Sequence, residues 1–312
     1  MLYKNFGFSI DSDIELPFLT NDNVNEKSDI QISKMINKPE LTEPIQIYSV
    51  NVSDSTQLVC KVMEHSKLLI LDFDNHICFR YKKENDRYVF NYYCYEKYQK
   101  DAMERLIGRF GMTYLLTWMG MTVLHGSAVI NREQAICFLA NSGGGKSSMA
   151  GLFVANGSLL MADELIVLKP YEKKAMLLPS SPYLQLSDES LQKIPLSNYP
   201  QQRIVVKFDN NGIENVETTN RVDLQSACVL EPYRCSKFII LDRGHNGEIK
   251  FQKHKKIDAY LSLLRFLYTP IIFPFMRKNL LTLMDFIELE QVCFSDCFNQ
   301  FEDMKSHIEQ KH

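Results

Sequence analysis

Ala140-Asn-Ser-Gly-Gly-Gly-Lys-Ser-Ser148 is the stretch of the chain that decides the fold. Four residues separate Ala140 from Gly145-Lys146-Ser147, which is the spacing of a P-loop whose first glycine is replaced by alanine. Three consecutive glycines let the backbone turn tightly, so that successive N–H groups point into one concavity. Such a concavity at the start of a helix binds phosphate.

The chemistry of this loop predicts a nucleotide site with ATP and Mg²⁺ as cofactors. Lys146 is long enough to reach the β- and γ-phosphates, and the hydroxyl of Ser147 is a ligand for Mg²⁺. We expect the phosphates to contact the whole loop, which comprises Asn141, Ser142, Gly143, Gly144, Gly145, Lys146, Ser147 and Ser148.

The flanking sequence supplies the context that a P-loop requires. Gln134-Ala-Ile-Cys-Phe-Leu139 predicts a short buried strand, residues 147–156 predict a helix, and Gly157 is a natural helix stop. The alternative is a glycine-rich turn between a strand and a helix that binds no ligand.

Two adjacent acids, Asp163 and Glu164, interrupt the apolar run over residues 158–168. A buried carboxylate pair is unfavourable unless a cation or a hydrogen-bond donor satisfies it, and beside a P-loop that cation is Mg²⁺. Neighbouring side chains on a strand point to opposite faces, so both acids reach the site only if the strand ends there. The alternative is a strand end with two solvated acids.

His125 lies on a predicted strand over residues 123–130, upstream of the loop. The ordinary pKa of histidine suits proton transfer, but a histidine on an apolar strand suits a structural hydrogen bond equally well. The chemistry of His125 alone therefore leaves both roles open.

Composition limits the class of protein. The 312 residues allow one large domain or two ordinary ones, and 45% hydrophobic with 23% charged residues is typical of a globular chain. A net charge of −3 disfavours broad capture of nucleic acid or of an anionic membrane, so we expect neither as a partner.

Cysteine usage and hydropathy predict a cytoplasmic protein. The eight cysteines are scattered and form no Cys-x-x-Cys pair, so we interpret them as reduced thiols. The first residues lack the features of a signal peptide. The apolar stretch 111–124 is too short to span a bilayer, and the stretch 259–275 is interrupted by a charge and by prolines, so both are interpreted as core helices.

We expect two domains, a β-rich N-terminal module over residues 1–95 and a nucleotide-binding domain over residues 96–312. Alternating apolar and polar residues predict mostly antiparallel strands in the module, and a helix over residues 96–120 joins the two parts. The strands expected in the module cover residues 29–33, 45–50 and 68–73 and a hairpin of 76–81 with 88–95.

The second domain continues with strand and then helix signals. Ser187-Asp188 caps a predicted helix over residues 187–194, and residues 257–305 predict mostly helix, broken at Pro270 and Pro274. Further strands are expected within residues 175–186, 203–218 and 238–241.

Three segments resemble the HPr kinase/phosphorylase-like P-loop proteins: Leu124-His-Gly-Ser-Ala-Val-Ile130, residues 135–148, and Leu160-Met-Ala-Asp-Glu-Leu-Ile-Val-Leu168. Tyr3-Lys-Asn-Phe-Gly-Phe8 and Ile14-Glu-Leu-Pro17 are similar to the stand-alone subgroup, which includes kinases of the C-terminal serine of lasso-peptide precursors. The resemblance implies an α/β fold with the nucleotide core of HPr kinases and phosphoenolpyruvate carboxykinases. That core is a mixed sheet with flanking helices, here preceded by the β-rich module.

The same resemblance implies roles for individual residues. His125 matches a histidine that assists proton handling, and Lys146 and Ser147 match the phosphate and Mg²⁺ contacts. Asp163 matches the aspartate that takes the proton from the acceptor serine. Glu164 occupies the position of a second acid near the metal, so the implied metal residues are Ser147 and Glu164.

The sequence also departs from the family. HPr kinases usually have glutamate where this chain has Ser148, and no segment matches the one associated with HPr docking and phosphorolysis. Both departures argue against HPr as the substrate and against the reverse reaction. The family also uses a downstream arginine near the phosphates, and Arg203, Arg221 and Arg243 are equal candidates for it.

The sequence therefore favours an ATP-dependent serine kinase that acts on a peptide or protein, with a lasso-peptide precursor as one candidate acceptor. The β-rich module is a candidate for acceptor recognition by strand pairing with an extended peptide. Three alternatives stay open: an HPr-type protein kinase, a small-molecule kinase on the same core, and a nucleotide-binding regulatory module without catalysis. Assembly into a homo-oligomer is also left open.

Overall fold

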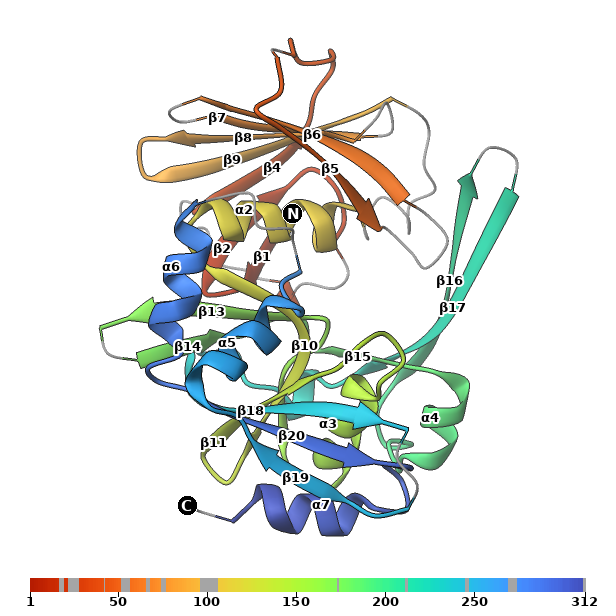
Figure 1. The fold of residues 1–312 in the computed structure, drawn as a ribbon. Coiled ribbons are helices and arrows are strands. Elements are labelled where there is room, and N and C mark those ends of the chain that lie inside the picture. Colours follow the sequence, from red (N-terminus) through yellow and green to blue (C-terminus); the bar gives the residue numbers. More distant parts are fainter. Residues whose placement is uncertain are drawn as a thin grey trace. The chain divides into compact units, whose positions relative to one another are not determined.

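The computed structural model describes residues 1–16, 20–21, 28–41, 43–51, 57–65, 68–73, 77–95, 106–172, 174–210, 213–244, 247–268 and 274–310 (Figure 1). The chain divides into two compact units. The first comprises residues 1–115 and 205–218, and the second comprises residues 116–204 and 219–312.

Strands dominate the described part of the chain. Those before the P-loop are β1 (Leu2–Asn5), β2 (Phe8–Ser12), β3 (Thr20–Asn21), β4 (Ile30–Lys34), β5 (Gln46–Asn51), β6 (Gln57–His65), β7 (Leu68–Phe73), β8 (Ile77–Glu84), β9 (Arg87–Cys94), β10 (Thr122–Asn131) and β11 (Gln134–Leu139). Those after it are β12 (Leu159–Ala162), β13 (Leu165–Tyr171), β14 (Lys174–Leu178), β15 (Tyr183–Leu186), β16 (Gln201–Asn210), β17 (Ile213–Asp223), β18 (Tyr233–Arg243), β19 (Lys250–Lys253) and β20 (Glu288–Phe294).

The helices are short. They are η1 (Leu106–Gly111), α2 (Met112–Trp118), α3 (Lys146–Ala155), α4 (Asp188–Lys193), η2 (Gln225–Ala227), α5 (Lys256–Leu264), α6 (Pro274–Leu283) and α7 (Phe301–Ile308).

The first unit is built on a sheet in the order β3-β1-β2-β4-β9-β8-β7-β6-β5. Only the β2–β4 and β4–β9 pairs are parallel among its described pairings, so the expected mostly antiparallel module is confirmed as a sheet. The expected hairpin is formed by β8 and β9, with a tight turn at Asn85, whose φ is 55°.

The first unit extends past the expected boundary at residue 95. The Tyr81 hydroxyl donates a hydrogen bond to the Gly111 carbonyl at 2.9 Å, and a Cβ at Gly111 would overlap the ring of Phe90. These contacts seat η1 against the N-terminal sheet, which is why the segment up to residue 115 groups with the first unit. The expected helix over 96–120 is described only from Leu106 onward.

The second unit contains a mixed sheet in which five strands close on themselves. The order β11-β10-β13-β14-β18 returns to β11 because β18 also pairs with β11 in parallel. Strands β20 and β19 continue the sheet from β18. The expected mixed sheet is therefore present, but its centre is a barrel rather than an open sheet.

The two faces of β11 explain its continuous apolar sequence. Cys137 and Leu139 belong to an apolar cluster that includes residues of α5 and α6. Ile136 and Phe138 belong to a second cluster that includes residues of α3 and α7. Because both faces are buried, this strand shows no alternation of apolar and polar residues.

Two expected elements differ in the structure. The strand over 158–168 is broken into β12 and β13 at Asp163 and Glu164, because Glu164 adopts a left-handed conformation with φ of 73°. The mostly helical region 257–305 contains strand β20, which pairs in parallel with β18. The strands expected within residues 203–218 are β16 and β17, which extend beyond these bounds on both sides. Pro274 begins α6, and Pro270 lies outside the described residues.

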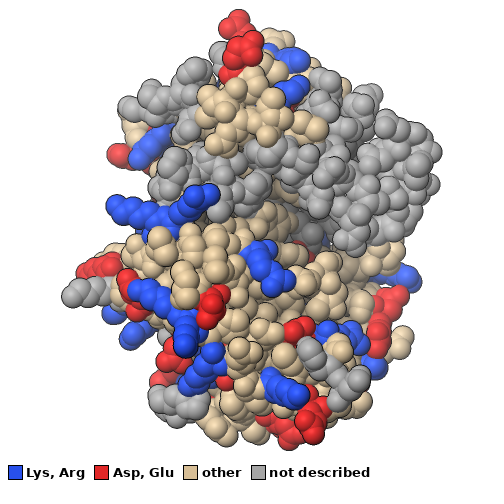
Figure 2. Space-filling model, in the orientation of Figure 1, with Lys and Arg blue, Asp and Glu red and all other residues tan. Residues whose placement is uncertain are grey.

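Charges of both signs are mixed on the face shown in Figure 2, in keeping with a net charge of −3. In the part of the chain that the structure describes, no helix is long and apolar enough to cross a membrane.

A substitution at Gly126 tests the close packing of the barrel. A Cβ at this position would lie 2.7 Å from the Phe138 carbonyl oxygen, which is backbone and has little room to move. We expect Gly126→Ala to lower the free energy of unfolding by about 2 kcal/mol, measured by urea denaturation. The control Lys174→Ala, at an exposed strand end, should change it by less than about 0.5 kcal/mol. Equal stability of the two variants would contradict this packing.

Candidate phosphate-binding site

The predicted strand, loop and helix lie in the expected order, with β11 ending at Leu139 and α3 beginning at Lys146. Gly143 and Gly145 have φ values of 71° and 93°, which side chains other than glycine rarely adopt. A Cβ at Gly144 would lie 2.6 Å from the Cβ of Ala140. The loop therefore requires glycine at all three positions, at Gly143 and Gly145 for the backbone conformation and at Gly144 for the contact with Ala140.

Lys146 closes over the loop. Its Nζ donates hydrogen bonds to the carbonyl oxygens of Ala140 at 3.2 Å and Asn141 at 3.4 Å. Burial lowers the pKa of this ammonium, while the nearby carboxylates of Glu164 and Asp163 raise it. An incoming anion can replace these two carbonyl contacts, because the ammonium is held only by neutral acceptors.

Asp163 is the most constrained group of the site. It is 3% exposed, and its Oδ1 accepts hydrogen bonds from the hydroxyls of Ser127 at 2.6 Å and Ser147 at 2.9 Å. Its Oδ2 accepts from the backbone N–H of Gln185 at 2.8 Å. Burial and the charge of Glu164 raise its pKa to about 6, against the opposing effect of the three hydrogen bonds.

The side chain of Glu164 points away from that of Asp163, because the left-handed turn separates the two acids. Its Oε2 lies 3.4 Å from Nε2 of His125, and the two side chains are 22% and 38% exposed. The backbone supports this pair, since the N–H of Gly126 donates to the Glu164 carbonyl at 3.2 Å. The structure therefore pairs a buried acid with the P-loop serine and a more exposed acid with the histidine.

A segment that the sequence did not single out lies beside His125. The N–H of His125 donates to the Phe266 carbonyl at 2.8 Å, and the N–H of Tyr268 donates to the Val123 carbonyl at 3.0 Å. The ring of Tyr268 stands edge-on to the imidazole, with centroids 5.6 Å apart. No motif in the sequence marks Tyr268. Ser127, by contrast, is a polar residue in an apolar strand, and that signal could have identified it.

Ser148 points toward α4 rather than along the loop. Its hydroxyl lies 2.8 Å from that of Ser190, which in turn accepts from the Ser187 hydroxyl at 3.0 Å. Ser187 is the N-cap of α4, as expected. This chain of hydroxyls ties the start of α3 to α4.

The three candidate arginines occupy different surroundings. Arg221 faces Gln185 across the β15–β17 pair and lies over the ring of Tyr183 at 5.3 Å. Arg203 lies 3.7 Å from Asp188 with both side chains exposed. Arg243 ends β18, the parallel neighbour of β11. Arg221 thus lies across the strand pair from Gln185, whose N–H donates to Asp163.

The oxygen atoms around Ser147 suit Mg²⁺ in their chemistry. Magnesium is usually held by one or two carboxylates together with phosphate oxygens and water, rather than by an all-protein cage. The described residues contain no group of three or more histidines, cysteines or acids that could hold a metal by themselves. The hydroxyl of Ser147 and the carboxylate of Asp163 therefore fit a site that a nucleotide completes. Glu164, which the resemblance places near the metal, lies instead 3.4 Å from His125.

Comparisons with known proteins add little. No family model matches the sequence, and no curated protein matches it. Among solved structures, the chain is similar to the HPr(Ser) kinase/phosphatase from Coxiella burnetii at 10% identity, over 60% of this chain and 99% of that one, with a TM-score of 0.30. This is a distant structural resemblance, too weak to assign a function.

The raised pKa of Asp163 predicts pH-dependent stability. The ordinary value is 3.8 and the folded value is about 6, so between them the folded protein retains a proton that the unfolded chain has released. The free energy of unfolding should therefore fall as the pH rises from about 4 to about 6. We expect Asp163→Asn to remove this fall.

The measurement is urea denaturation of both proteins across that pH range without magnesium. Asp303→Asn, which changes an exposed aspartate of α7, is the matched control and should keep the wild-type pH profile. Parallel profiles for the wild type and Asp163→Asn would show that Asp163 does not titrate in this window.

Proposed function

We propose that this chain is an ATP-dependent kinase that transfers the γ-phosphoryl group to a serine hydroxyl of a peptide or protein. The observation that carries the proposal is the 2.9 Å hydrogen bond between the Ser147 hydroxyl and the buried Asp163 carboxylate, directly after the three glycines. An acid that orients the P-loop serine belongs to nucleotide sites, whereas a plain glycine-rich turn has no need of one.

The loop and Lys146 account for phosphate binding. Asn141, Ser142 and Gly143 are exposed, so the backbone N–H groups of this segment are accessible to a phosphate chain. Lys146 would exchange its two carbonyl acceptors for phosphate oxygens, which adds charge-assisted hydrogen bonds. When bound, Mg²⁺ would neutralise charge on the phosphates, and Ser147 with Asp163 would hold it.

We assign different roles to the two acids, Asp163 and Glu164. The resemblance implies Asp163 as the proton acceptor, and its pKa of about 6 would suit a general base. Its two oxygens, however, already accept three hydrogen bonds in a buried position. We therefore assign Asp163 to orienting Ser147 and the metal, and we assign acceptance of the serine proton to the more exposed Glu164, supported by His125.

The acceptor class follows from the resemblance alone and stays a proposal. A peptide that ends in serine, as in a lasso-peptide precursor, is the first acceptor to try. A small-molecule kinase, an HPr-type kinase and a regulatory module without transfer share the same loop, so only product analysis separates them.

Lys146→Ala tests whether the loop binds nucleotide. Removal of the ammonium should weaken Mg·ATP binding by about ten- to a hundredfold, since a charge-assisted hydrogen bond contributes about 1.5–3 kcal/mol. Lys174→Ala removes an exposed lysine in the same unit and should leave the affinity unchanged. Unaltered affinity in Lys146→Ala would contradict a phosphate site at this loop.

Glu164→Gln and Asp163→Asn test the division of roles. Glu164→Gln should keep Mg·ATP affinity and reduce phosphorylation of a serine-ending peptide by about a hundredfold or more, because the proton acceptor is lost. Asp163→Asn should weaken Mg·ATP affinity as well as transfer. Intact-mass analysis of the peptide, with an alanine-ending peptide as control, measures transfer. Full activity of Glu164→Gln would exclude Glu164 as the base and return that role to Asp163.

A further inference from the structure

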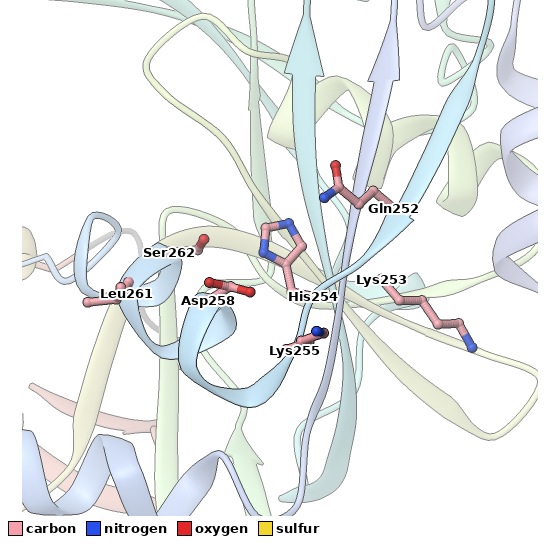
Figure 3. Close-up of a pocket in the computed structure, with 7 residues that line it drawn as sticks. All are labelled: Gln252, Lys253, His254, Lys255, Asp258, Leu261 and Ser262. Atoms are coloured by element: carbon pink, nitrogen blue, oxygen red, sulfur yellow. The ribbon is translucent and has the colours of Figure 1, made fainter.

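A second candidate site lies away from the P-loop, where β19 leads into α5. A pocket of about 560 Å³ opens there (Figure 3). Gln252 from the strand, His254 directly after it, and Asp258 and Ser262 from the helix present polar groups toward this space, whereas Lys253 extends away from it. The pocket therefore has polar walls on two elements and is not a gap within the apolar core.

The strand beside the pocket has an open edge. β19 ends the order of its sheet among the described strands and pairs with β20 on its other side. The N–H of His254 donates to the Leu289 carbonyl, and Gln252 pairs with Gln291 in the same register. In an antiparallel pair the outward and inward groups alternate, so the N–H and C=O of Phe251 and Lys253 face the open edge. Such an edge is a template for an added strand.

Lysines outnumber acids among the residues that line the pocket, in a chain whose net charge is negative. Lys253 and Lys255 are exposed and line the pocket, Lys250 is exposed at the start of β19, and Lys256 is paired with Asp285. Asp258 is the one acid that lines the pocket. A ligand with negative charges is therefore favoured on this edge, because it meets an excess of lysines.

Apolar side chains next to the lysines limit the kinds of ligand that this surface can bind. Ile257 and Leu261 on α5 are 62% and 54% exposed, and they lie one helical turn apart on the same face. Open backbone groups, lysines and exposed apolar side chains together suit an extended peptide with alternating acidic and apolar residues. A nucleic acid would use the lysines but leave the two apolar side chains without a partner.

We propose that the open edge of β19, with the pocket at its end, binds an extended acidic peptide segment by strand addition. The added strand pairs with the outward groups of Phe251 and Lys253, its acidic side chains meet the lysines, and an apolar side chain covers Leu261. The further statement that this segment belongs to the phosphate acceptor rests on the proposed kinase function. Binding itself does not, since no residue of the P-loop takes part.

Fluorescence anisotropy of the full chain without nucleotide tests the binding. The probe is a fluorescein-labelled ten-residue peptide of alternating glutamate and valine, compared with one in which glutamine replaces every glutamate. The acidic peptide should bind at least tenfold more tightly, and Lys253→Glu/Lys255→Glu should weaken its binding at least tenfold. The control Lys169→Glu/Lys174→Glu makes the same charge change at exposed positions on β13 and β14 and should have no such effect.

Two further probes decide the mode of binding. An acidic peptide N-methylated at every residue has no backbone N–H to donate, so it cannot complete the strand ladder and should lose most of its affinity. A single-stranded oligonucleotide of similar charge should bind more weakly than the acidic peptide. Equal binding of the acidic and glutamine peptides, no effect of N-methylation, or tighter binding of the oligonucleotide would each overturn the proposal. Lys146→Ala should bind the acidic peptide normally, which separates this result from the fate of the kinase proposal.

Discussion

The site depends on one buried carboxylate and the three donors that hold it. Asp163 draws its hydrogen bonds from Ser127 on β10, Ser147 at the start of α3 and Gln185 on β15. A carboxylate buried without such donors would be strongly unfavourable, so the three elements are locked into one arrangement around it. Asp163, which lies outside the loop, thereby fixes the position of Ser147.

The register of the sheet brings His125 and the start of the P-loop close to each other. Gly126 pairs with Leu139, so His125 stands beside the end of the strand that feeds the loop. The parallel strands β11, β18 and β20 end at one edge of the sheet, and the loop leaves from that edge. Ligands of α/β proteins are commonly bound outside the carboxyl ends of such strands. The closed barrel thus supplies a rigid frame for the loop and for the Glu164–His125 pair.

The sequence predicted the parts of this site that are local. The strand before the loop, the helix after it and the α4 cap are encoded by neighbouring residues, and all three are present. The partners of Asp163 were not predicted, because Ser127 and Gln185 meet it through pairings between distant strands. The break at Asp163 was not resolved either, since the left-handed turn falls on Glu164 and no glycine signals it. The sequence did not predict strand β20, because Glu290 is an acid that is nevertheless buried in this strand beside His307.

The central claim is that Ser147 and Asp163 form a nucleotide site that magnesium completes. Titration calorimetry of ATP with the wild-type chain, in magnesium and then in EDTA, tests it most directly when repeated with Ser147→Ala. The account predicts uptake of ATP that is strong with magnesium, much weaker in EDTA, and clearly less dependent on magnesium in Ser147→Ala. No uptake by the folded wild type, or the same magnesium dependence in Ser147→Ala, would contradict it.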